Sequence, residues 1–330
     1  MSLRSAAASA VDGVLEAFIA PSFSRVGYVV RRRLEGWREL DGYDLRGRVV
    51  LLTGATSGLG LAAAAQLARC GATLVLVSRS AERLESTRDA LVAQTGNAAI
   101  SWIEADLTNL GAVRRATAEF GARHDRLDVL IHNAGVLLQD RKVTSEGIEL
   151  TVASQVVGPF LLTELLLDCL KASAPARVLL MASGGMYAVP LEVEQLELAP
   201  SSYSGSRQYA LAKRAQVSLA ALWGRKLEGT GVVVHSLHPG WVDTPGLREG
   251  LPGFTRLIGR QLRTPGQGAD TLVWLAVDER ALESTGRFWH DRRPRALHRW
   301  FGTRSTDTAA RRHALWAYCE SRSGWRGPRM

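Results

Sequence analysis

The sequence predicts an α/β protein built on a single doubly wound parallel sheet with helices on both faces. Three observations indicate this fold class. Short apolar runs of β-type residues alternate with helical patterns from Arg48 to about Trp289, a glycine-rich turn joins the first run to the first helix, and no linker interrupts the series. Alternation of strands and helices is typical of a parallel sheet, because each crossover helix packs back on the sheet.

The first strand and the first helix flank the glycine-rich turn. Residues 48–53 (RVVLLT) are mostly apolar, the turn is Gly54-Ala-Thr-Ser-Gly58-Leu-Gly60, and alanine is frequent over residues 61–70. Glycine lets the backbone approach a ligand, and the free N–H groups and dipole of a helix N-terminus attract a phosphate. Glycine clusters also mark ordinary turns, but a strand before and a helix after this one predict a nucleotide site.

The second strand, residues 72–77, ends at Ser78-Arg79. A site for NAD uses a carboxylate near this strand end to hold the ribose 2′-hydroxyl, whereas an arginine accommodates the 2′-phosphate of NADP. Neither Ser78 nor Ser80 is acidic, so the sequence favours NADP(H) over NAD(H). The alternative is that Arg79 only opens the helix predicted over residues 81–94, whose charged side chains are typical of a solvated face.

Tyr209 and Lys213 lie four residues apart in a segment that is predicted to be helical, so their side chains share a face. A positive charge beside a phenol favours the phenolate and lowers the tyrosine pKa from about 10. Tyr209 would then exchange a proton near neutral pH. Lysine is scarce in this arginine-rich chain, which makes a lysine at this spacing less ordinary. The alternative is a pair of solvated residues on a helix face.

The glycine loop and Tyr209-x-x-x-Lys213, in this order and separation, resemble the short-chain dehydrogenase/reductase family over about residues 46–290. Further segments are similar to family elements: residues 132–135 (HNAG) to its Asn-Asn-Ala-Gly, residues 239–244 (PGWVDT) to its Pro-Gly-x-x-x-Thr, and Ser183 to its catalytic serine at the end of a strand over 177–181. The resemblance implies a Rossmann-type fold and hydride transfer between NADP(H) and a carbonyl or alcohol. No metal is implied.

The resemblance also assigns residues. Tyr209 would protonate the developing alkoxide, Ser183 would polarise the carbonyl, and Lys213 would lower the tyrosine pKa and bind the nicotinamide ribose. Asp106, after a strand predicted at 99–104, would border the adenine pocket. The expected cofactor-binding residues are Thr53, Gly54, Ser57, Gly58, Leu59, Gly60, Ser78, Arg79, Asp106, Leu107, Asn133, Ala134, Gly135, Tyr209, Lys213, Pro239, Gly240, Val242 and Thr244.

Finer motifs resemble one subgroup, the dehydrogenase/reductase member-twelve type. They include residues 183–186 (SGGM), 238–246 (HPGWVDTPG) and 267–271 (QGADT). The chain departs from the family at one position. The fourth catalytic residue of the family is an asparagine three residues before a glycine, and counting back from Gly158 gives Gln155. The asparagine holds a proton-relay water partly through its backbone, so we expect Gln155 to be able to take this role.

The two ends of the chain lie outside the predicted catalytic domain, which we place at residues 47–290. Residues 287–330 carry a net charge of +8, and the tail 291–330 is expected to be a basic extension. Residues 1–46 are predicted to form an amphipathic helical extension, with apolar stripes at Val11, Val14, Leu15, Phe18 and Ile19 and at Phe23, Val26, Val30, Leu34 and Trp37. These stripes could lie on an anionic membrane or pack on the domain or a partner subunit.

The segment between Pro245 and Pro265 is predicted to be a substrate lid. Its apolar residues would suit a bulky lipophilic carbonyl or alcohol, or would simply cover the core. The chain's length and its 46% hydrophobic content suffice for a full core, and three scattered cysteines are compatible with the cytoplasm. We expect a cytoplasmic protein, with contact to a membrane surface through residues 1–46 as one alternative.

Other functions are considered against these features. The arginine-rich tail lacks a nucleic-acid recognition motif, so no nucleic-acid partner is expected. A catalytically inactive nucleotide-binding, membrane-associated scaffold is the main alternative, but the retained Ser183, Tyr209 and Lys213 argue against it. A nucleotide-sugar epimerase or dehydratase is disfavoured because no long C-terminal sugar-binding domain is present. The family resemblance implies a homodimer or homotetramer through the helices around 150–170 and 211–227.

Overall fold

The computed structural model describes residues 3–299 and 301–327, so the extreme ends of both predicted extensions, with residue 300, lie outside the described residues. An eight-stranded sheet forms the centre, in the order β3-β2-β1-β4-β5-β6-β7-β8. Seven strands are parallel, and β8 pairs antiparallel with β7. The strands are β1 (Val49–Thr53), β2 (Thr73–Ser78), β3 (Ile100–Glu104), β4 (Val129–His132), β5 (Ala176–Met181), β6 (Val232–Leu237), β7 (Arg287–His290) and β8 (Arg293–Arg295).

The predicted doubly wound α/β fold is therefore confirmed. Strand order reverses between β1 and β4, and ligands of such sheets bind outside the carboxyl ends of the strands at this switch point. The predicted strands agree with the observed ones to within about one residue, because buried parallel strands are short continuous apolar runs. The sheet extends past residue 290, since β8 follows a tight turn after β7.

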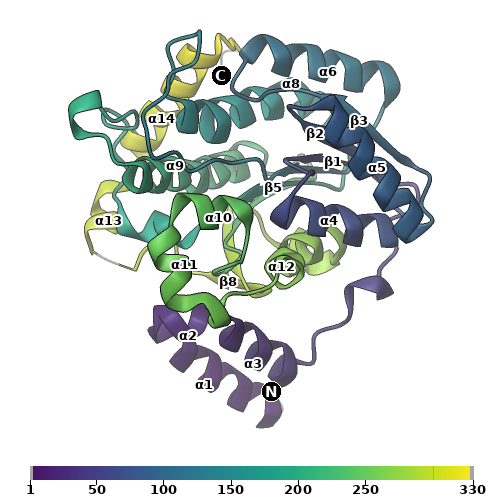
Figure 1. The fold of residues 1–330 in the computed structure, drawn as a ribbon, viewed down its shortest axis with the longest axis vertical. Helices are drawn as coiled ribbons and strands as arrows, with labels where there is room; N and C mark the ends of the chain where they lie inside the picture. The colour runs from purple at the N-terminus through teal and green to yellow at the C-terminus, as the bar shows by residue number, and fades with distance from the viewer. Residues whose placement is uncertain (1–2, 300, 328–330) are drawn as a thin grey trace.

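Helices cover both faces of the sheet (Figure 1). Alternate strand residues point to opposite sides: Leu51 and Val75 pack in one core cluster with α6 (Leu110–Arg123), α8 (Gly158–Ala172) and α9 (Gly205–Lys226). Val50 and Leu74 pack in the other with α4 (Gly58–Arg69), α5 (Ala81–Thr95) and α12 (Pro265–Val277). This two-sided burial explains why the strands contain few polar residues.

Helix α8 continues from α7 (Leu150–Val152) through a π-helical turn at Ala153–Val157. The whole stretch Leu150–Ala172 is the one helix among the described residues that is long and apolar enough to cross a membrane. It is 78% buried inside the protein over its most apolar window, as expected for a core helix.

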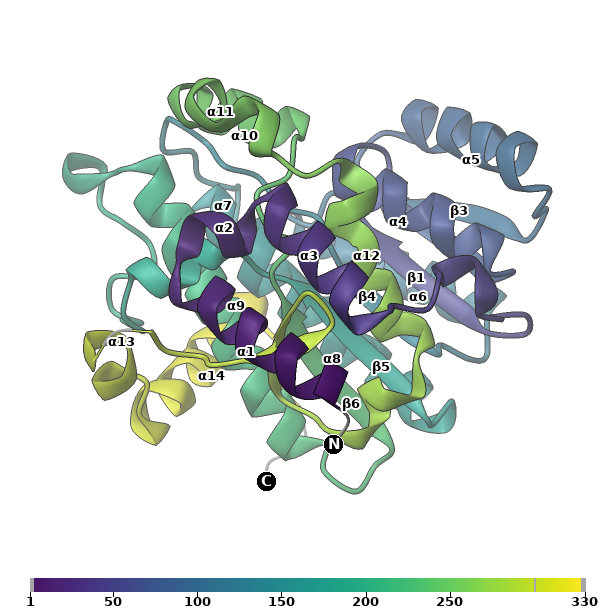
Figure 2. The ribbon, with the colours of Figure 1, turned by 90° about the horizontal axis from the view of Figure 1, so that it is seen from below.

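The N-terminal extension forms three helices, α1 (Leu3–Ala17), α2 (Ile19–Phe23) and α3 (Arg25–Glu35). They lie together at one end of the molecule, against α12 and the β7–β8 hairpin (Figures 1 and 2). Most residues of the two apolar stripes predicted here do not dock on the domain, and Phe23 is the stripe residue that is buried. Val14 and Phe18 are 64% and 62% exposed, whereas Asp12 and Arg31 are buried. The extension docks through charges because the domain presents charged partners to it, as described below.

The lid contains α10 (Pro245–Gly250) and α11 (Pro252–Ile258), and the tail contains α13 (Phe301–Thr306) and α14 (Ala309–Ser323). Helix α14 packs on α8 and α9, with the Trp316 ring 4.9 Å from Phe160 and 6.0 Å from Trp223. These two helices are where the sequence led us to expect a subunit interface. In the described chain, its own C-terminal helix contacts both of them.

Candidate active site

The glycine loop lies at the carboxyl end of β1 and opens α4. Gly54 and Gly58 have φ of +70° and +52°, which residues with a side chain rarely adopt. A Cβ on Gly54 would lie 2.8 Å from the Cα of Ala134, so the loop also packs closely on the segment after β4. Ser57 is the N-cap residue of α4, but its side chain makes no capping hydrogen bond. The first N–H groups of α4 are thus left for a ligand, and the loop fits a diphosphate.

The segment after β4 is tied to this loop. Asn133 donates through Nδ2 to the carbonyls of Thr53 (3.2 Å) and Gly54 (3.1 Å). The Thr53 hydroxyl accepts the backbone N–H groups of Asn133 and Ala134, both at 3.1 Å. A Cβ on Gly60 would overlap the Gly54 carbonyl and meet Asn133 Nδ2. These residues therefore shape the cradle, because their polar side chains satisfy backbone groups that the sheet leaves open.

The carboxyl end of β2 places two arginines beside the loop. Arg79 is exposed, and no hydrogen bond or ion pair engages its side chain among residues 3–299 and 301–327. Arg83, in the first turn of α5, directs its guanidinium toward the Thr56 carbonyl of the glycine loop at 3.4 Å. The Ser78 hydroxyl lies 3.5 Å from that of Thr56. Arg83 is exposed, as its place on a solvated helix face predicts, and only its closeness to the glycine loop was not expected from the sequence.

Asp106 and Leu107 follow β3 on the same edge of the sheet. The Asp106 carboxylate accepts the backbone N–H (2.9 Å) and hydroxyl (2.8 Å) of Thr108, which fixes the turn leading into α6. Leu107 is buried, and a Cβ on Gly158 would overlap its carbonyl. Both residues thus lie at the carboxyl end of the sheet, as expected of residues near the adenine pocket.

Ser183, Tyr209 and Lys213 come together at the ends of β5 and α9. The Ser183 side chain lies beside Tyr209, close enough to lower the pKa of the phenol. The Lys213 ammonium lies 5.2 Å from the centre of the Tyr209 ring and donates to the Met181 carbonyl (2.7 Å) and Gln216 Oε1 (2.9 Å). The hydroxyls of Ser183 and Tyr209 and the amine of Lys213 therefore lie together at the sheet edge that carries the glycine loop.

The proton affinities differ from the sequence expectation. Burial raises the pKa of Tyr209 to about 12, and the hydrogen bond from Ser183 offsets this only in part. Burial lowers the pKa of Lys213 to about 7. The predicted depression of the tyrosine pKa by Lys213 is thus wrong for this ligand-free site. Removal of both groups from water disfavours their charged forms, and this cost outweighs their attraction at the observed separation.

Gln155 lies in the π-helical turn before α8 and is fully buried. Its side-chain amide donates to the Val136 carbonyl at 2.7 Å, and its side chain packs against Gly135. Its Oε1 is buried and meets no donor among the described residues. A π-helical turn inside an α-helix frequently marks a functional site, and here it turns an unpaired acceptor toward the segment after β4.

His132, which stands where the family has an asparagine, is buried at the end of β4. Its Nε2 lies 2.8 Å from the Thr163 hydroxyl, and burial lowers its pKa to about 3. The imidazole is therefore neutral at physiological pH and joins β4 to α8.

The loop after β6 (residues 239–244) returns the chain to the glycine loop. Gly240 has φ of +82°, and the Thr244 methyl would be 3.3 Å from a Cβ on Gly58. The Thr244 hydroxyl caps α10 by accepting the Leu247 N–H at 3.2 Å. Val242 is buried and forms a parallel bridge with Arg263. The sequence pattern of the lid places Arg263 on its solvent side with Arg248, Arg256 and Arg260, and this expectation is wrong: Arg263 is 1% exposed, because its partners lie far away in the chain.

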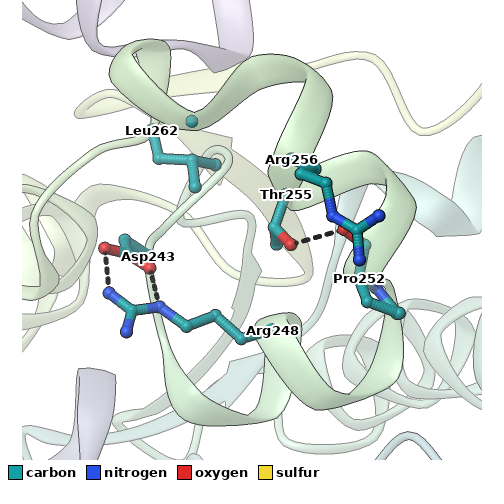
Figure 3. A pocket seen from close by; sticks show the side chains of 7 residues that line it. Asp243, Arg248, Pro252, Thr255, Arg256 and Leu262 are labelled. Carbon is teal, nitrogen blue, oxygen red and sulfur yellow. Dashed lines mark hydrogen bonds and ion pairs between the residues drawn. The ribbon is translucent and has the colours of Figure 1, made fainter.

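The lid stands over this edge. One cleft of about 480 Å³ lies beneath it, where Asp243 pairs with Arg248 at 2.6 Å and Thr255 donates to the Pro252 carbonyl (Figure 3). A second cleft, of about 620 Å³, is lined by the lid, by Gln139 and by the start of α9 near Tyr203. Since α9 carries Tyr209, the second cleft is the better candidate for the route to the reacting groups.

A glycine loop that fits a diphosphate lies with a serine, a tyrosine and a lysine at the switch point of a doubly wound sheet. This combination is typical of a nucleotide-dependent oxidoreductase. Residues 48–251 match the family described as short chain dehydrogenase. The chain belongs to this family.

Comparison with individual proteins shows which members of the family this chain resembles. The chain is 36% identical over 267 residues to human dehydrogenase/reductase SDR family member 12, covering 81% of this chain and 83% of that one. It is 32% identical to human retinol dehydrogenase 13, and the match covers 74% of this chain and 76% of that protein. The solved structure of L-sorbose reductase from Gluconobacter frateurii, complexed with NADPH and L-sorbose, has a TM-score of 0.60 at 20% identity, covering 75% and 95%. That structure shares the fold. The resemblance to the member-twelve type is confirmed.

Proposed function

We propose that this dehydrogenase/reductase interconverts a carbonyl and an alcohol on a lipophilic small molecule with NADP(H). The observation that carries the proposal is the cluster of Ser183, Tyr209 and Lys213 at the sheet edge that holds the glycine loop. A bound nicotinamide would supply or accept the hydride. The residues of this chain would then align and protonate the reacting oxygen.

The roles follow from the contacts of each side chain. The Tyr209 hydroxyl donates its proton to the oxygen that becomes the alcohol, and its high pKa keeps it protonated over the physiological range. Ser183 holds the same oxygen by a hydrogen bond. Lys213 is held by Met181 and Gln216 so that its ammonium faces the tyrosine ring. The unpaired Oε1 of Gln155 is available to hold a relay water.

A preference for NADP(H) is supported by the two arginines at the end of β2. Arg79 has a free guanidinium, and Arg83 reaches the glycine loop from α5. An arginine at this place suits a 2′-phosphate. The L-sorbose reductase that shares the fold was solved with NADPH. On this basis we propose that Arg79 and Arg83 together bind the 2′-phosphate.

A lipophilic substrate is supported by the lid. No residue of α11 is buried, so its apolar side chains do not serve as a cover for the core. Phe254 instead contacts Trp241 of the loop after β6 at 5.1 Å, and Leu257 is 84% exposed. Relatives named for retinol, itself a lipophilic alcohol, are consistent with such a substrate.

The outward stripe of the N-terminal extension supports contact of a cytoplasmic protein with a membrane surface. Val14, Phe18 and Val26 are more than half exposed, and Arg25 is exposed beside them. Apolar side chains with neighbouring arginines are typical of helices that lie on anionic membranes. Self-association is also expected from the family, with α14 shielding part of the face first considered for it.

Replacement of Tyr209 by Phe tests the proposed chemistry. The ring is kept and the acid is lost, so turnover of lipophilic aldehydes and ketones should fall by at least about 10²-fold. NADPH binding, followed by quenching of tryptophan fluorescence, should remain near that of the parent. A variant that keeps turnover within about tenfold of the parent would contradict the assignment.

The cofactor preference has a separate test. The parent should bind NADPH more tightly than NADH, and the Arg79→Ala and Arg83→Ala variants should each lose affinity for NADPH only. Equal affinities of the parent for both cofactors would overturn the proposed phosphate site but leave the dehydrogenase chemistry standing.

A further inference from the structure

The N-terminal extension meets the domain at a buried cluster of charges. Arg31 of α3 is 1% exposed and pairs with Asp12 of α1 and with Asp291, both at 2.7 Å. Asp291 also binds Arg263 at 2.5 Å. A buried charge is tolerated only where partners and hydrogen bonds compensate its loss of water. Arg31, Asp291 and Arg263 are therefore a single unit that joins the extension to the domain.

The turn that presents Asp291 is itself unusual. Asp291 and Arg292 form the two-residue connection between β7 and β8, with φ of +52° and +54°. Hairpin turns of this kind favour glycine or asparagine, because positive φ is unfavourable for other residues. Arg292 is held by Asp270 at 2.7 and 2.8 Å, and Asp291 is held by Arg31 and Arg263. The charged partners hold the turn in this conformation.

Arg263 also contacts residues 239–244, which resemble the family's Pro-Gly-x-x-x-Thr element that holds the nicotinamide carboxamide; we call them the proposed nicotinamide loop. Its side chain donates to the Pro239 carbonyl at 3.3 Å, and a Cβ on Gly240 would lie 2.5 Å from its Cζ. Its backbone N–H donates to the Trp241 carbonyl at 2.7 Å, and its carbonyl accepts the Asp243 N–H at 2.9 Å. The loop after β6 therefore rests on Arg263.

The Arg263 guanidinium also forms hydrogen bonds with the N-terminal extension. Arg263 donates to the carbonyls of Ser22 (3.0 Å) and Ser24 (3.1 Å), at the junction of α2 and α3. Between these serines, the Phe23 carbonyl accepts the N–H of Trp241 at 2.8 Å. Residues 22–24 are thus bonded directly to the proposed nicotinamide loop and to the arginine beneath it.

Phe23 also contacts the segment that contains the proposed catalytic serine, Ser183. Its ring packs edge-on against His238, with centroids 4.3 Å apart, and His238 Nδ1 accepts the N–H of Gly184 at 2.9 Å. A Cβ on Gly184 would lie 2.6 Å from Phe23 Cε2. Gly184 directly follows Ser183, so Phe23 lies behind the proposed catalytic serine.

We propose that residues 22–24 of the N-terminal extension are a working part of the active site, with Phe23 and Arg263 as positioning residues. They fix the position of the Ser183 segment relative to the 239–244 loop, so that the reacting oxygen and the nicotinamide face each other. This inference rests on the proposed function. It adds that a segment outside the sheet domain sets the geometry of the reaction.

A comparison of two phenylalanines tests the inference. The Phe23→Ala variant removes the ring behind Ser183, while Phe120→Ala removes a fully buried ring in α6, in the core cluster on the far side of the sheet from the extension. Phe23→Ala should lower kcat by about 10²-fold, because small misplacements of reacting groups have effects of this size. Phe120→Ala should lower the melting temperature but keep kcat at a temperature where it is folded.

A binding measurement separates this inference from the proposed reaction. Phe23→Ala should lower the affinity for NADPH, which contains a nicotinamide. The affinity for adenosine 2′,5′-bisphosphate, which lacks a nicotinamide, should stay at the parent's value. If the parent binds NADPH but reduces no carbonyl, the proposed function fails, while this binding contrast still tests the positioning role. Unchanged kcat and unchanged NADPH affinity in Phe23→Ala would overturn the inference, as would equal losses of kcat in both alanine variants.

The conservative pair Phe23→Leu and Phe120→Leu repeats the comparison should an alanine variant fail to fold. Phe23→Leu retains apolar bulk behind Gly184 and should recover part of kcat relative to Phe23→Ala. A kcat in Phe23→Leu no lower than in Phe120→Leu, together with unchanged NADPH affinity, would count against the positioning role.

Discussion

The two ends of this chain are both rich in arginine and helical, yet they dock on the sheet domain in opposite ways. The N-terminal extension buries charges, with Arg31 and Asp12 paired at its interface, and leaves Val14 and Phe18 in solvent. The C-terminal helix α14 buries Leu315 and Trp316 against α8 and α9, and its arginines are half-buried at the margin of this contact.

The difference teaches that an amphipathic pattern identifies a helix but does not say which of its faces docks. The receiving surface decides this. Asp291 and Arg295 on the β7–β8 hairpin offer charges to α1 and α3, and Phe160 and Trp223 offer aromatic rings to α14. Each end presents the face that its own site can satisfy, because an unpaired buried charge costs more than an apolar side chain left in water.

The largest effect on stability is expected from Arg31. The Arg31→Met variant removes one arginine partner from each of Asp12 and Asp291 in a buried site and leaves them Arg295 and Arg263, which should cost about 3 kcal/mol of unfolding free energy. The exposed pair of Arg32 with Glu39 is the control, and Arg32→Met should change stability by less than about 1 kcal/mol. Urea denaturation measures both. Equal losses would mean that the extension is not held by the buried pairs.

The apolar docking of α14 is probed through Trp316. Trp316→Ala should cost about 3 kcal/mol, since the ring fills a site between Phe160 and Trp223. Phe301, which is 86% exposed in the same tail, is the control, and its alanine variant should stay within about 0.5 kcal/mol of the parent. A loss in Trp316→Ala no greater than in Phe301→Ala would refute the proposed anchor. Light scattering would also show whether freed α8 and α9 surfaces self-associate.

Acid should distinguish the two ends. Burial raises the pKa of Asp12, but Arg295 and Arg31 outweigh it and lower the pKa to about 2 from its usual 3.8. A carboxyl whose pKa is lowered by folding contributes stability above its unfolded pKa, and this is lost as the pH falls through the folded value. About 2 kcal/mol of docking energy should thus disappear between pH 4 and about pH 2.

The measurement is limited proteolysis or hydrogen exchange of the two ends along an acid titration. The extension should open before α14, whose docking rests on the buried side chains of Leu315 and Trp316. Simultaneous opening of both ends, with no earlier change in α1–α3, would contradict this order.

The smallest effect on stability is expected from the outward stripe. The Val14→Ser and Phe18→Ser changes should alter unfolding free energy by no more than about 0.5 kcal/mol, because both side chains are largely exposed. They should nevertheless weaken binding to vesicles that contain anionic lipid, measured by co-sedimentation. Val143→Ser, at a 45% exposed position outside the extension, is the control. Vesicle binding that is absent in the parent, or unchanged in the variants, would exclude this surface as the contact.

Local patterns predicted most of the central fold. Strands β1, β2, β3 and β5 were expected within about a residue of their bounds, and the glycine loop was placed correctly between β1 and α4. These features depend on neighbours in sequence: continuous apolar runs for buried strands, and glycines where the backbone must adopt positive φ. For the same reason, Tyr209 and Lys213 were correctly expected on one helix.

Patterns could not predict what depends on the surroundings of a side chain. The pKa of Tyr209 moved opposite to expectation because burial, which no spacing reveals, outweighs the nearby lysine. Arg83 is a surface residue, as expected, but the sequence did not show that α5 begins so close to the glycine loop that its side chain reaches Thr56. Phe23 was assigned to an apolar stripe and lies instead behind Gly184.

The sequence by itself determined the fold class, the family and the set of groups that meet at the carboxyl edge of the sheet, because short-range preferences and motif spacing carry this information. Only the tertiary structure decided which face of the extension is buried, how Arg263 joins Ser22 to Pro239, and which groups lose their water. The docking of the extension depends on pairs of residues more than 200 positions apart, such as Arg263 with Ser22 and Arg31 with Asp291, and the burial of a charge is decided by what the folded chain places around it.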